Sequence, residues 1–185
     1  TYPACIHSQR KITRLHELNG LNIRTSGKIL SELLGKLGAT PAQIPSSEVY
    51  LASERGMVNG VVVSWRSMTE SRLHEVMPYH YELPLGASPT LLIMDRNQFN
   101  RLPEDKRNIL QSYGAELAKM WGEVYDEVNR LSRQQISNDN NTSQVSPADM
   151  ATFHRIAEEV ISSWSLQEPN RQELLNTFRT QLDRF

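Results

Sequence analysis

The sequence lacks several features by which function is often recognised. Its 185 residues carry a formal net charge of -1 and one cysteine, Cys5. The mixed charges form no basic stretch, which argues against a nucleic-acid partner. One cysteine cannot form an internal disulfide, and without catalytic context we interpret Cys5 as a packed thiol rather than a nucleophile. No apolar run approaches the roughly 20 residues that span a bilayer.

The usual signatures of catalysis, cofactor binding and metal binding are also missing. The sequence has no G-x-S-x-G and no G-x-G-x-x-G, and Ser26-Gly27-Lys28 lacks the upstream glycines of a phosphate cradle. The five histidines show neither H-x-x-x-H nor H-E-x-x-H spacing. We therefore predict no catalytic residue, no metal ion and no cofactor, and we expect a protein that is not an enzyme.

Short strand-like and helical segments alternate in the first half of the sequence. Three segments have strand-like patterns: 21–25, 42–45 and 57–63. Helices are predicted after Ser26, which we expect to be an N-cap, and after Ser46 or Ser47. Gly38 is well placed to end the first helix. The alternation predicts an α/β architecture with a largely parallel sheet that is covered on both faces.

Helical periodicity dominates the second half. Two further segments have strand-like patterns: 79–85 and 90–94. From Pro103 to Leu131 the apolar residues keep to one helical face, over ~43 Å at about 1.5 Å per residue. This length exceeds the width of a small domain. We therefore expect the helix to span two lobes or to pack against another chain. A polar loop over 134–145 separates it from two more helices, the first capped by Ser146.

Two side chains stand at the ends of predicted strands. Arg24 lies where strand 21–25 meets the following helix, and Trp65 follows strand 57–63. In α/β sheets ligands collect outside the carboxyl ends of strands, and a helix N-terminus favours an anion. Position alone leaves alternatives open. Arg24 is a ligand-binding residue, a surface arginine or part of a structural ion pair, and Trp65 either faces a ligand or belongs to the core.

Five segments in a fixed order carry a resemblance to a known family: HELNGLNIRTSG, LGATPAQIPSSEVY, ERGMVNGVVVSW, RLHEVMPYH and LPEDKRNIL. Together they resemble the C-terminal part of a solute-binding protein of tripartite ATP-independent periplasmic (TRAP) transporters, of the C4-dicarboxylate-binding type. The resemblance implies a periplasmic-binding-protein-like lobe, with a parallel or mixed sheet flanked by helices and a long lobe-spanning helix. It also implies a periplasmic protein that captures a small organic acid and delivers it to the membrane permease subunits.

The resemblance divides the chain into parts. Residues 2–89 and 131–185 would form the second ligand-binding lobe, and 90–130 would complete a first lobe that is otherwise missing. Relatives carry a signal peptide and most of the first lobe upstream, and the opening TYPAC, which has no initiator methionine, suggests a chain cut from something longer. In the alternative interpretation the truncated chain binds no solute and forms a homo-oligomer through exposed helical faces.

The family motif written here as LNIRT implies that Arg24 forms a bidentate salt bridge with the ligand carboxylate, a geometry that suits guanidinium better than ammonium. Val63 stands where the dicarboxylate and sialate branches carry a ligand-binding asparagine, and Trp65 resembles a pocket-lining tryptophan of another branch. Ser46 replaces an aromatic residue of the sialate branch, and Ala4 replaces a second arginine of some members. The predicted ligand-binding residues are Ser26, Arg24, Ser46, Val63, Ser64 and Trp65.

The identities of these residues also predict the kind of ligand. Val63 and Trp65 offer apolar surface rather than hydrogen bonds. The departures from the family pattern at Val63, Ser46 and Ala4 argue against a dicarboxylate or sialate ligand. We therefore predict an aromatic or branched monocarboxylate, such as a 2-oxo acid.

Overall fold

The computed structural model describes residues 3–87 and 90–182, and its centre is a six-stranded sheet in the order β3-β2-β4-β1-β5-β6. The strands are β1 Cys5–Ser8, β2 Asn22–Thr25, β3 Thr40–Gln43, β4 Gly60–Val63, β5 Tyr79–Tyr81 and β6 Thr142–Ser143. Strand β2 is parallel to β3 and β4, and β5 is parallel to β6, whereas β1 is antiparallel to β4 and β5. The mixed sheet confirms the fold that the resemblance implied. It corrects the largely parallel sheet that the alternation of strands and helices predicted, because β1, which no pattern predicted, enters its centre.

Several predicted strands are shifted or shortened. Strand β3 begins at Thr40 rather than at position 42, since the Thr40 N–H already donates to the Leu21 carbonyl at 2.8 Å. Strand β4 begins at Gly60 rather than at position 57, because the Met57 N–H instead bonds to the Ala52 carbonyl at the end of a helix. Strand β5 ends at Tyr81, four residues short of the predicted end.

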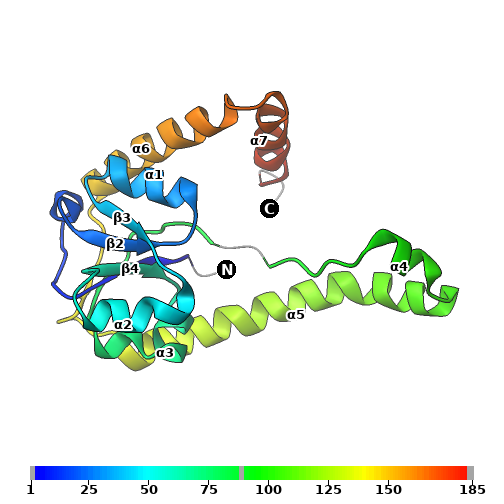
Figure 1. The fold of residues 1–185 in the computed structure, drawn as a ribbon, viewed down its shortest axis with the longest axis horizontal. Coiled ribbons are helices and arrows are strands. Elements are labelled where there is room, and N and C mark those ends of the chain that lie inside the picture. The colour runs from blue at the N-terminus through cyan, green and yellow to red at the C-terminus, as the bar shows by residue number, and fades with distance from the viewer. Residues whose placement is uncertain (1–2, 88–89, 183–185) are drawn as a thin grey trace.

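Helices cover both faces of the sheet (Figure 1). The helices are α1 Lys28–Lys36, α2 Val49–Glu54, α3 Trp65–Glu70, α4 Arg96–Arg101, α5 Glu104–Ile136, α6 Pro147–Ser165 and α7 Pro169–Leu182, with short 3-10 turns at Leu15–Leu18, Ser46–Glu48 and Leu73–Glu75. Helices α1 and α6 pack together on one face, and α2, α3 and the C-terminal part of α5 lie on the other. Successive side chains of β4 point to opposite faces of the sheet and so contribute to both cores. Val62 belongs to the core under α1 and α6, and Val61 belongs to the core under α2 and α3.

The helix ends confirm some predicted caps and correct others. Ser146 caps α6 as expected, since its Oγ accepts from the Asp149 N–H at 3.1 Å and Pro147 follows. Ser26 does not cap α1. Gly27 precedes that helix with φ of 98°, a left-handed conformation that favours glycine. Pro45 precedes the next helical turn, so neither Ser46 nor Ser47 is its N-cap.

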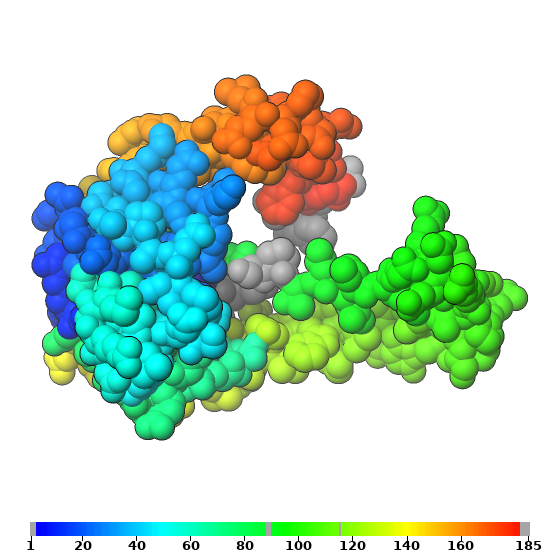
Figure 2. All heavy atoms as spheres, viewed as in Figure 1, coloured from blue at the N-terminus to red at the C-terminus, as the bar shows by residue number. Residues whose placement is uncertain are grey.

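Helix α5 is longer at its C-terminal end than predicted, with 33 residues and a length of about 50 Å. Its C-terminal part packs on α3. The rest of α5, with α4 and the extended segment before it, projects from the lobe as an arm over residues 90–124 (Figure 1 and Figure 2). The strand predicted at 90–94 is wrong for this structure: the segment joins no sheet among the described residues, and Leu92 is 92% exposed.

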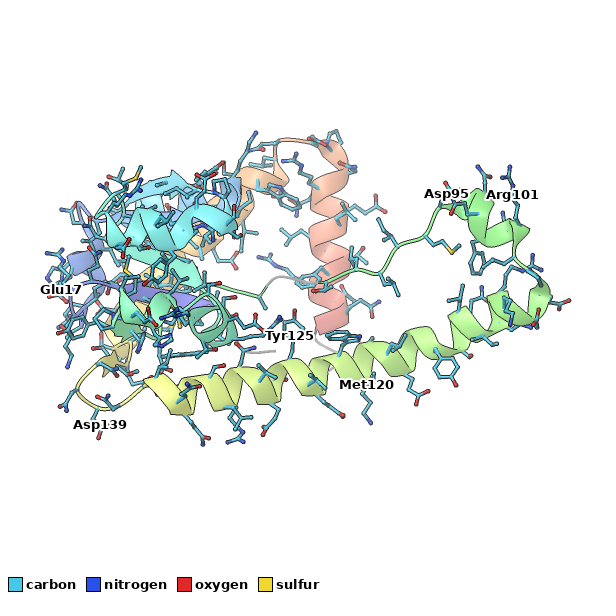
Figure 3. All side chains as sticks on the ribbon, turned by 60° about the horizontal axis from the view of Figure 1, so that its bottom comes forward. Glu17, Asp95, Arg101, Met120, Tyr125 and Asp139 are labelled. Carbon is cyan, nitrogen blue, oxygen red and sulfur yellow. The ribbon has the colours of Figure 1, made fainter. Side chains whose placement is uncertain are left out.

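The predicted apolar face of α5 exists but is largely uncovered. The exposed members of this stripe, each 48–57% accessible, are Ile109, Leu110, Tyr113, Met120, Trp121, Val124 and Leu131. Tyr125 and Met120 project from opposite sides of the helix (Figure 3), and the Tyr125 ring lies against Arg66 of α3. The side of α5 that carries Met120 therefore differs from the side that packs on the lobe. None of the described helices is both long and apolar enough to cross a membrane.

Candidate functional site

The carboxyl ends of β2, β3 and β4 meet at one edge of the sheet, because these three strands are parallel. We call this the strand-end edge; it comprises Arg24 to Ser26, Ile44 to Ser46, and Val63 to Trp65. The register brings Arg24 opposite Ala42 of β3 and Val61 of β4. Residues from three separate stretches of the sequence are therefore neighbours at this edge, as the strand-end positions of Arg24 and Trp65 predicted.

Arg24 is the electrostatic centre of the strand-end edge. Its residue is 7% exposed, its Nε donates to the Ile44 carbonyl at 2.9 Å, and its Nη2 lies 3.4 Å from the Ser46 Oγ. Burial lowers the pKa of the guanidinium from its usual value. Within the described part of the chain, no carboxylate pairs with Arg24. A fixed, largely desolvated cation whose Nη atoms remain available is suited to bind an anion.

The three predicted serines lie at the edge in different surroundings. Ser46 contacts Arg24 directly, although both Ser46 and Ser26 are exposed. Ser64 is the N-cap of α3, where its Oγ accepts from the Ser67 N–H at 3.3 Å and lies 3.1 Å from the Ser67 Oγ. The structure therefore brings Ser46 to the arginine and uses Ser64 to begin a helix.

Val63 and Trp65 differ in how much surface they present. Val63 is the partly exposed last residue of β4, whereas Trp65 is the first residue of α3 and only 2% exposed. The indole contacts His7 and His80 edge-on, with ring centroids 5.0 and 4.7 Å apart. In this conformation Val63 is partly exposed at the edge, whereas the Trp65 indole packs on His7 and His80.

The sequence interpretation missed the groups that hold the edge in place. The carbonyl of Ile44 orients Arg24, but a backbone acceptor has no sequence signal. Asn129 of α5 is also important, because its Oδ1 accepts from the Arg66 N–H at the start of α3 and its Nδ2 donates to the Tyr125 carbonyl. Polar residues are common on an amphipathic helix, so the sequence carries no signal for Asn129, which ties α5 to the strand-end edge.

Nothing in this arrangement resembles a catalytic or metal centre. Among the residues that the structure describes, no group of three or more histidine, cysteine, aspartate or glutamate side chains could hold a metal ion. Cys5 is buried, and burial raises the pKa of its thiol, so the reactive thiolate is suppressed. The edge is suited to binding through charge and shape.

Comparison with known proteins identifies the family. The model of the family described as bacterial extracellular solute-binding protein, family 7, matches residues 4–167, and the chain belongs to this family. A curated solute-binding protein of Albidiferax ferrireducens is 28% identical over 113 residues, which are 60% of this chain and 33% of that protein. The family's members and structural relatives are transport proteins rather than enzymes.

Two solved TRAP solute-binding proteins are similar in structure. One, from Desulfovibrio salexigens, is 30% identical with a TM-score of 0.77, and 88% of this chain covers 51% of that chain. It was crystallised as an open complex with the C-terminus of a symmetry mate in its ligand-binding site. The other, from Rhodoferax ferrireducens, contains copurified benzoate; it is 26% identical with a TM-score of 0.84, and 98% of this chain covers 60% of it. The chain thus spans between about a third and three fifths of the lengths of these relatives.

Proposed function

We propose that the chain supplies the arginine-bearing lobe of a periplasmic protein that captures an organic acid and delivers it to a TRAP membrane permease. The observation that carries the proposal is Arg24, a largely buried guanidinium held by the Ile44 carbonyl and without a carboxylate partner in the described part of the chain. Leaving a buried cation unpaired is costly, and a ligand carboxylate at the strand-end edge would offset that cost.

The proposed ligand is an aromatic or branched monocarboxylate, such as a 2-oxo acid. Val63 presents an aliphatic surface beside Arg24, where it can cover the apolar body of a ligand whose carboxylate is bound by the guanidinium. Trp65 would support this surface from beneath, since it follows Val63 by two residues and is buried. The benzoate in the Rhodoferax ferrireducens relative is an aromatic monocarboxylate, which supports the same class of ligand.

The proposed division of the chain is the one that the resemblance implies, and the exposed surfaces support it. Residues 2–89 and 131–185 would form the second ligand-binding lobe, and 90–130 would complete a first lobe that is otherwise missing. The bare arm supports the proposal, because it presents Leu91, Leu92 and Ile93 almost fully exposed and continues into the uncovered stripe of α5. Exposed apolar surface of this extent is typical of an interface.

Isothermal titration calorimetry with a panel of acids tests the proposal. The panel contains benzoate, phenylpyruvate, a branched 2-oxo acid, malate and succinate. The proteins are the 185-residue chain and the two-lobed protein proposed above, which we call the natural protein. We expect the natural protein to bind the apolar monocarboxylates most tightly. The chain alone should bind weakly, since an ion pair open to water contributes only about 0 to 1 kcal/mol. Preference for malate or succinate would contradict the ligand class, and no binding of any acid by the natural protein would contradict the function.

The exposed apolar stripe on α5 favours a second candidate function, in which the 185-residue chain by itself is an oligomerising domain. The apolar residues of this stripe recur in steps of four, four and three from Ile109 to Leu131, an 11-residue repeat that keeps one face of the helix apolar. Such a face could pair with a second copy and make the chain an oligomerising domain. Sedimentation velocity separates the candidates: a monomer at micromolar concentration contradicts self-association, and a dimer dissociated by Met120→Glu supports it.

A further inference from the structure

A pair of buried histidines lies on the sheet behind the strand-end edge. His7 of β1 and His80 of β5 are register partners, and their Nδ1 atoms are 2.8 Å apart. Both residues are almost completely buried. One ring must donate and the other accept in this contact, so the pair as built is satisfied when both imidazoles are neutral. His7 Nε2 also lies 3.3 Å from the Val63 carbonyl at the end of β4.

The pair connects the sheet to α3 and α5 through Trp65. The indole packs on both imidazole rings, and the guanidinium of Arg133 from α5 lies 5.8 Å above the indole. Arg133 in turn pairs with Glu82, which follows β5, through both carboxylate oxygens. Strands, α3 and the C-terminal part of α5 therefore meet in one buried cluster.

Few titratable groups face the histidines, and none except Glu82 would stabilise a proton on them. From β1, Cys5 Sγ lies 3.4 Å from His7 Nε2, and its buried thiol stays uncharged. Glu82 is already bound by Arg133, whose positive charge opposes protonation of His80. His74, from the turn before β5, also opposes it. The backbone carbonyls of Val63 and Ile136 favour the protonated rings of His7 and His80, respectively. Because Glu82 is already bound by Arg133, an added proton would nevertheless place a second positive charge near Arg133 and Trp65.

The direction of the pKa shifts agrees with this geometry. Burial, followed by the neighbouring His80, lowers the pKa of His7 from 6.5 to about 3, and burial lowers that of His80 to about 4. Because the folded pKa values lie below the ordinary 6.5, the packed state binds fewer protons than an opened state. Its stability is complete above about pH 6.5 and decreases as the pH falls towards these lower values.

We propose that His7 and His80 form an acid-sensitive latch, whose protonation releases Trp65 and the C-terminal part of α5 from the sheet while the opposite face stays packed. On the α5 side the attachment is largely polar: it uses Asn129, the contact between Ser132 and Thr69, and the pair of Arg133 with Glu82. The face under α1 and α6 is held by the larger apolar cluster. His154 contacts Phe153 of that cluster but is exposed to solvent. Because α5 carries the arm, the latch would control how the arm is oriented relative to the lobe.

A single-tryptophan protein tests the latch. With Trp121→Phe and Trp164→Phe, Trp65 is the only tryptophan, and its fluorescence is followed together with far-UV circular dichroism as the pH is lowered from neutrality. We expect the Trp65 emission to shift to longer wavelength before the ellipticity decreases. His7→Gln with His80→Gln should move the fluorescence midpoint lower by about one pH unit or more. His154→Gln, at an exposed position on α6, should leave the midpoint unchanged.

Two outcomes would overturn the latch: coincident fluorescence and ellipticity transitions, or an unchanged midpoint in the double glutamine variant. If that variant fails to fold, NMR titration of the imidazole Hε1 resonances in the single-tryptophan protein decides the question. The latch requires at least one of the two rings to become protonated with the same midpoint as the Trp65 transition. Exposure of Trp65 while both rings remain neutral would contradict it.

Discussion

The Nε of Arg24 donates a 2.9 Å hydrogen bond to the carbonyl oxygen of Ile44, so an arginine of β2 is oriented by the loop that follows β3. This bond uses the donor that points along the side chain and leaves the Nη atoms at the strand-end edge. A lysine has no donor equivalent to Nε. The orientation of the cation, and not only its charge, therefore depends on arginine at this position.

Arg24→Lys in the natural protein is expected to weaken binding of the preferred acid about 10- to 100-fold, since charge-assisted hydrogen bonds contribute about 1.5 to 3 kcal/mol. Arg55→Lys is the control, because Arg55 is exposed and lies at the end of α2. Calorimetry of both variants measures the effect. If the Arg24→Lys variant bound the acid with the same affinity as the parent protein, Arg24 would not be a ligand-binding residue.

Trp65→Phe is expected to lower the free energy of unfolding by about 1 to 3 kcal/mol, because the smaller ring leaves a cavity against His7 and His80. Trp121→Phe is the matched control, since Trp121 is 57% exposed and should change stability by less than about 0.5 kcal/mol. Urea denaturation followed by circular dichroism measures both. Similar values for the two variants would show that Trp65 is not a packing residue.

Asn129→Ala is expected to destabilise the protein by about 1 to 3 kcal/mol, since it leaves the Arg66 N–H at the start of α3 without its acceptor. Amide hydrogen exchange at the beginning of α3 should accelerate in this variant. Asn108→Ala changes an exposed asparagine of the same helix and serves as the control. Unchanged exchange at Arg66 after loss of Asn129 would contradict the capping role.

Asp149→Asn is expected to reduce stability at neutral pH and to have little effect in strong acid. Burial of this carboxylate alone would raise its pKa, but the Leu15 N–H, the Ser146 side chain and Arg14 outweigh burial and lower it. A carboxyl with a lowered folded pKa stabilises the protein above its unfolded pKa, and the contribution is lost as the pH falls through the folded value. The melting temperatures of the two proteins should therefore converge as the pH is lowered from neutrality into strong acid. If the difference in melting temperature stayed constant in acid, the charge of Asp149 would not be the cause. Asp139→Asn, which changes an exposed aspartate, is the control.

The Cys5 thiol is expected to react with Ellman's reagent only when the protein opens. It is 3% exposed, and burial raises its pKa, so accessible thiolate is scarce in the folded protein. The absorbance of the released thionitrobenzoate should rise slowly in native buffer and rapidly in denaturant. Fast stoichiometric reaction under native conditions would show that β1 is not held in the centre of the sheet.

Much of the fold was predictable because its signals are local. Gly38 ends the first helix as predicted, with φ of 93°, and Ser146 with Pro147 begins α6 as predicted. The long helix was evident from its periodicity, although it extends five residues past Leu131. Strand β1 was not predicted, since its four residues are all buried and show no alternation. Its place between β4 and β5 comes from pairing with residues more than 50 positions away.

The strand-end edge shows the same division between local and tertiary causes. The sequence by itself determined that Arg24 ends a strand before a helix, because hydrophobic alternation and glycine conformation are properties of a few neighbouring residues. Only the tertiary structure decided that Ile44 orients this arginine, that Val63 stays accessible, and that Trp65 turns into the core. Those outcomes depend on which strands become neighbours and on which side chains burial places together, and such contacts between distant segments leave no periodic pattern in the sequence.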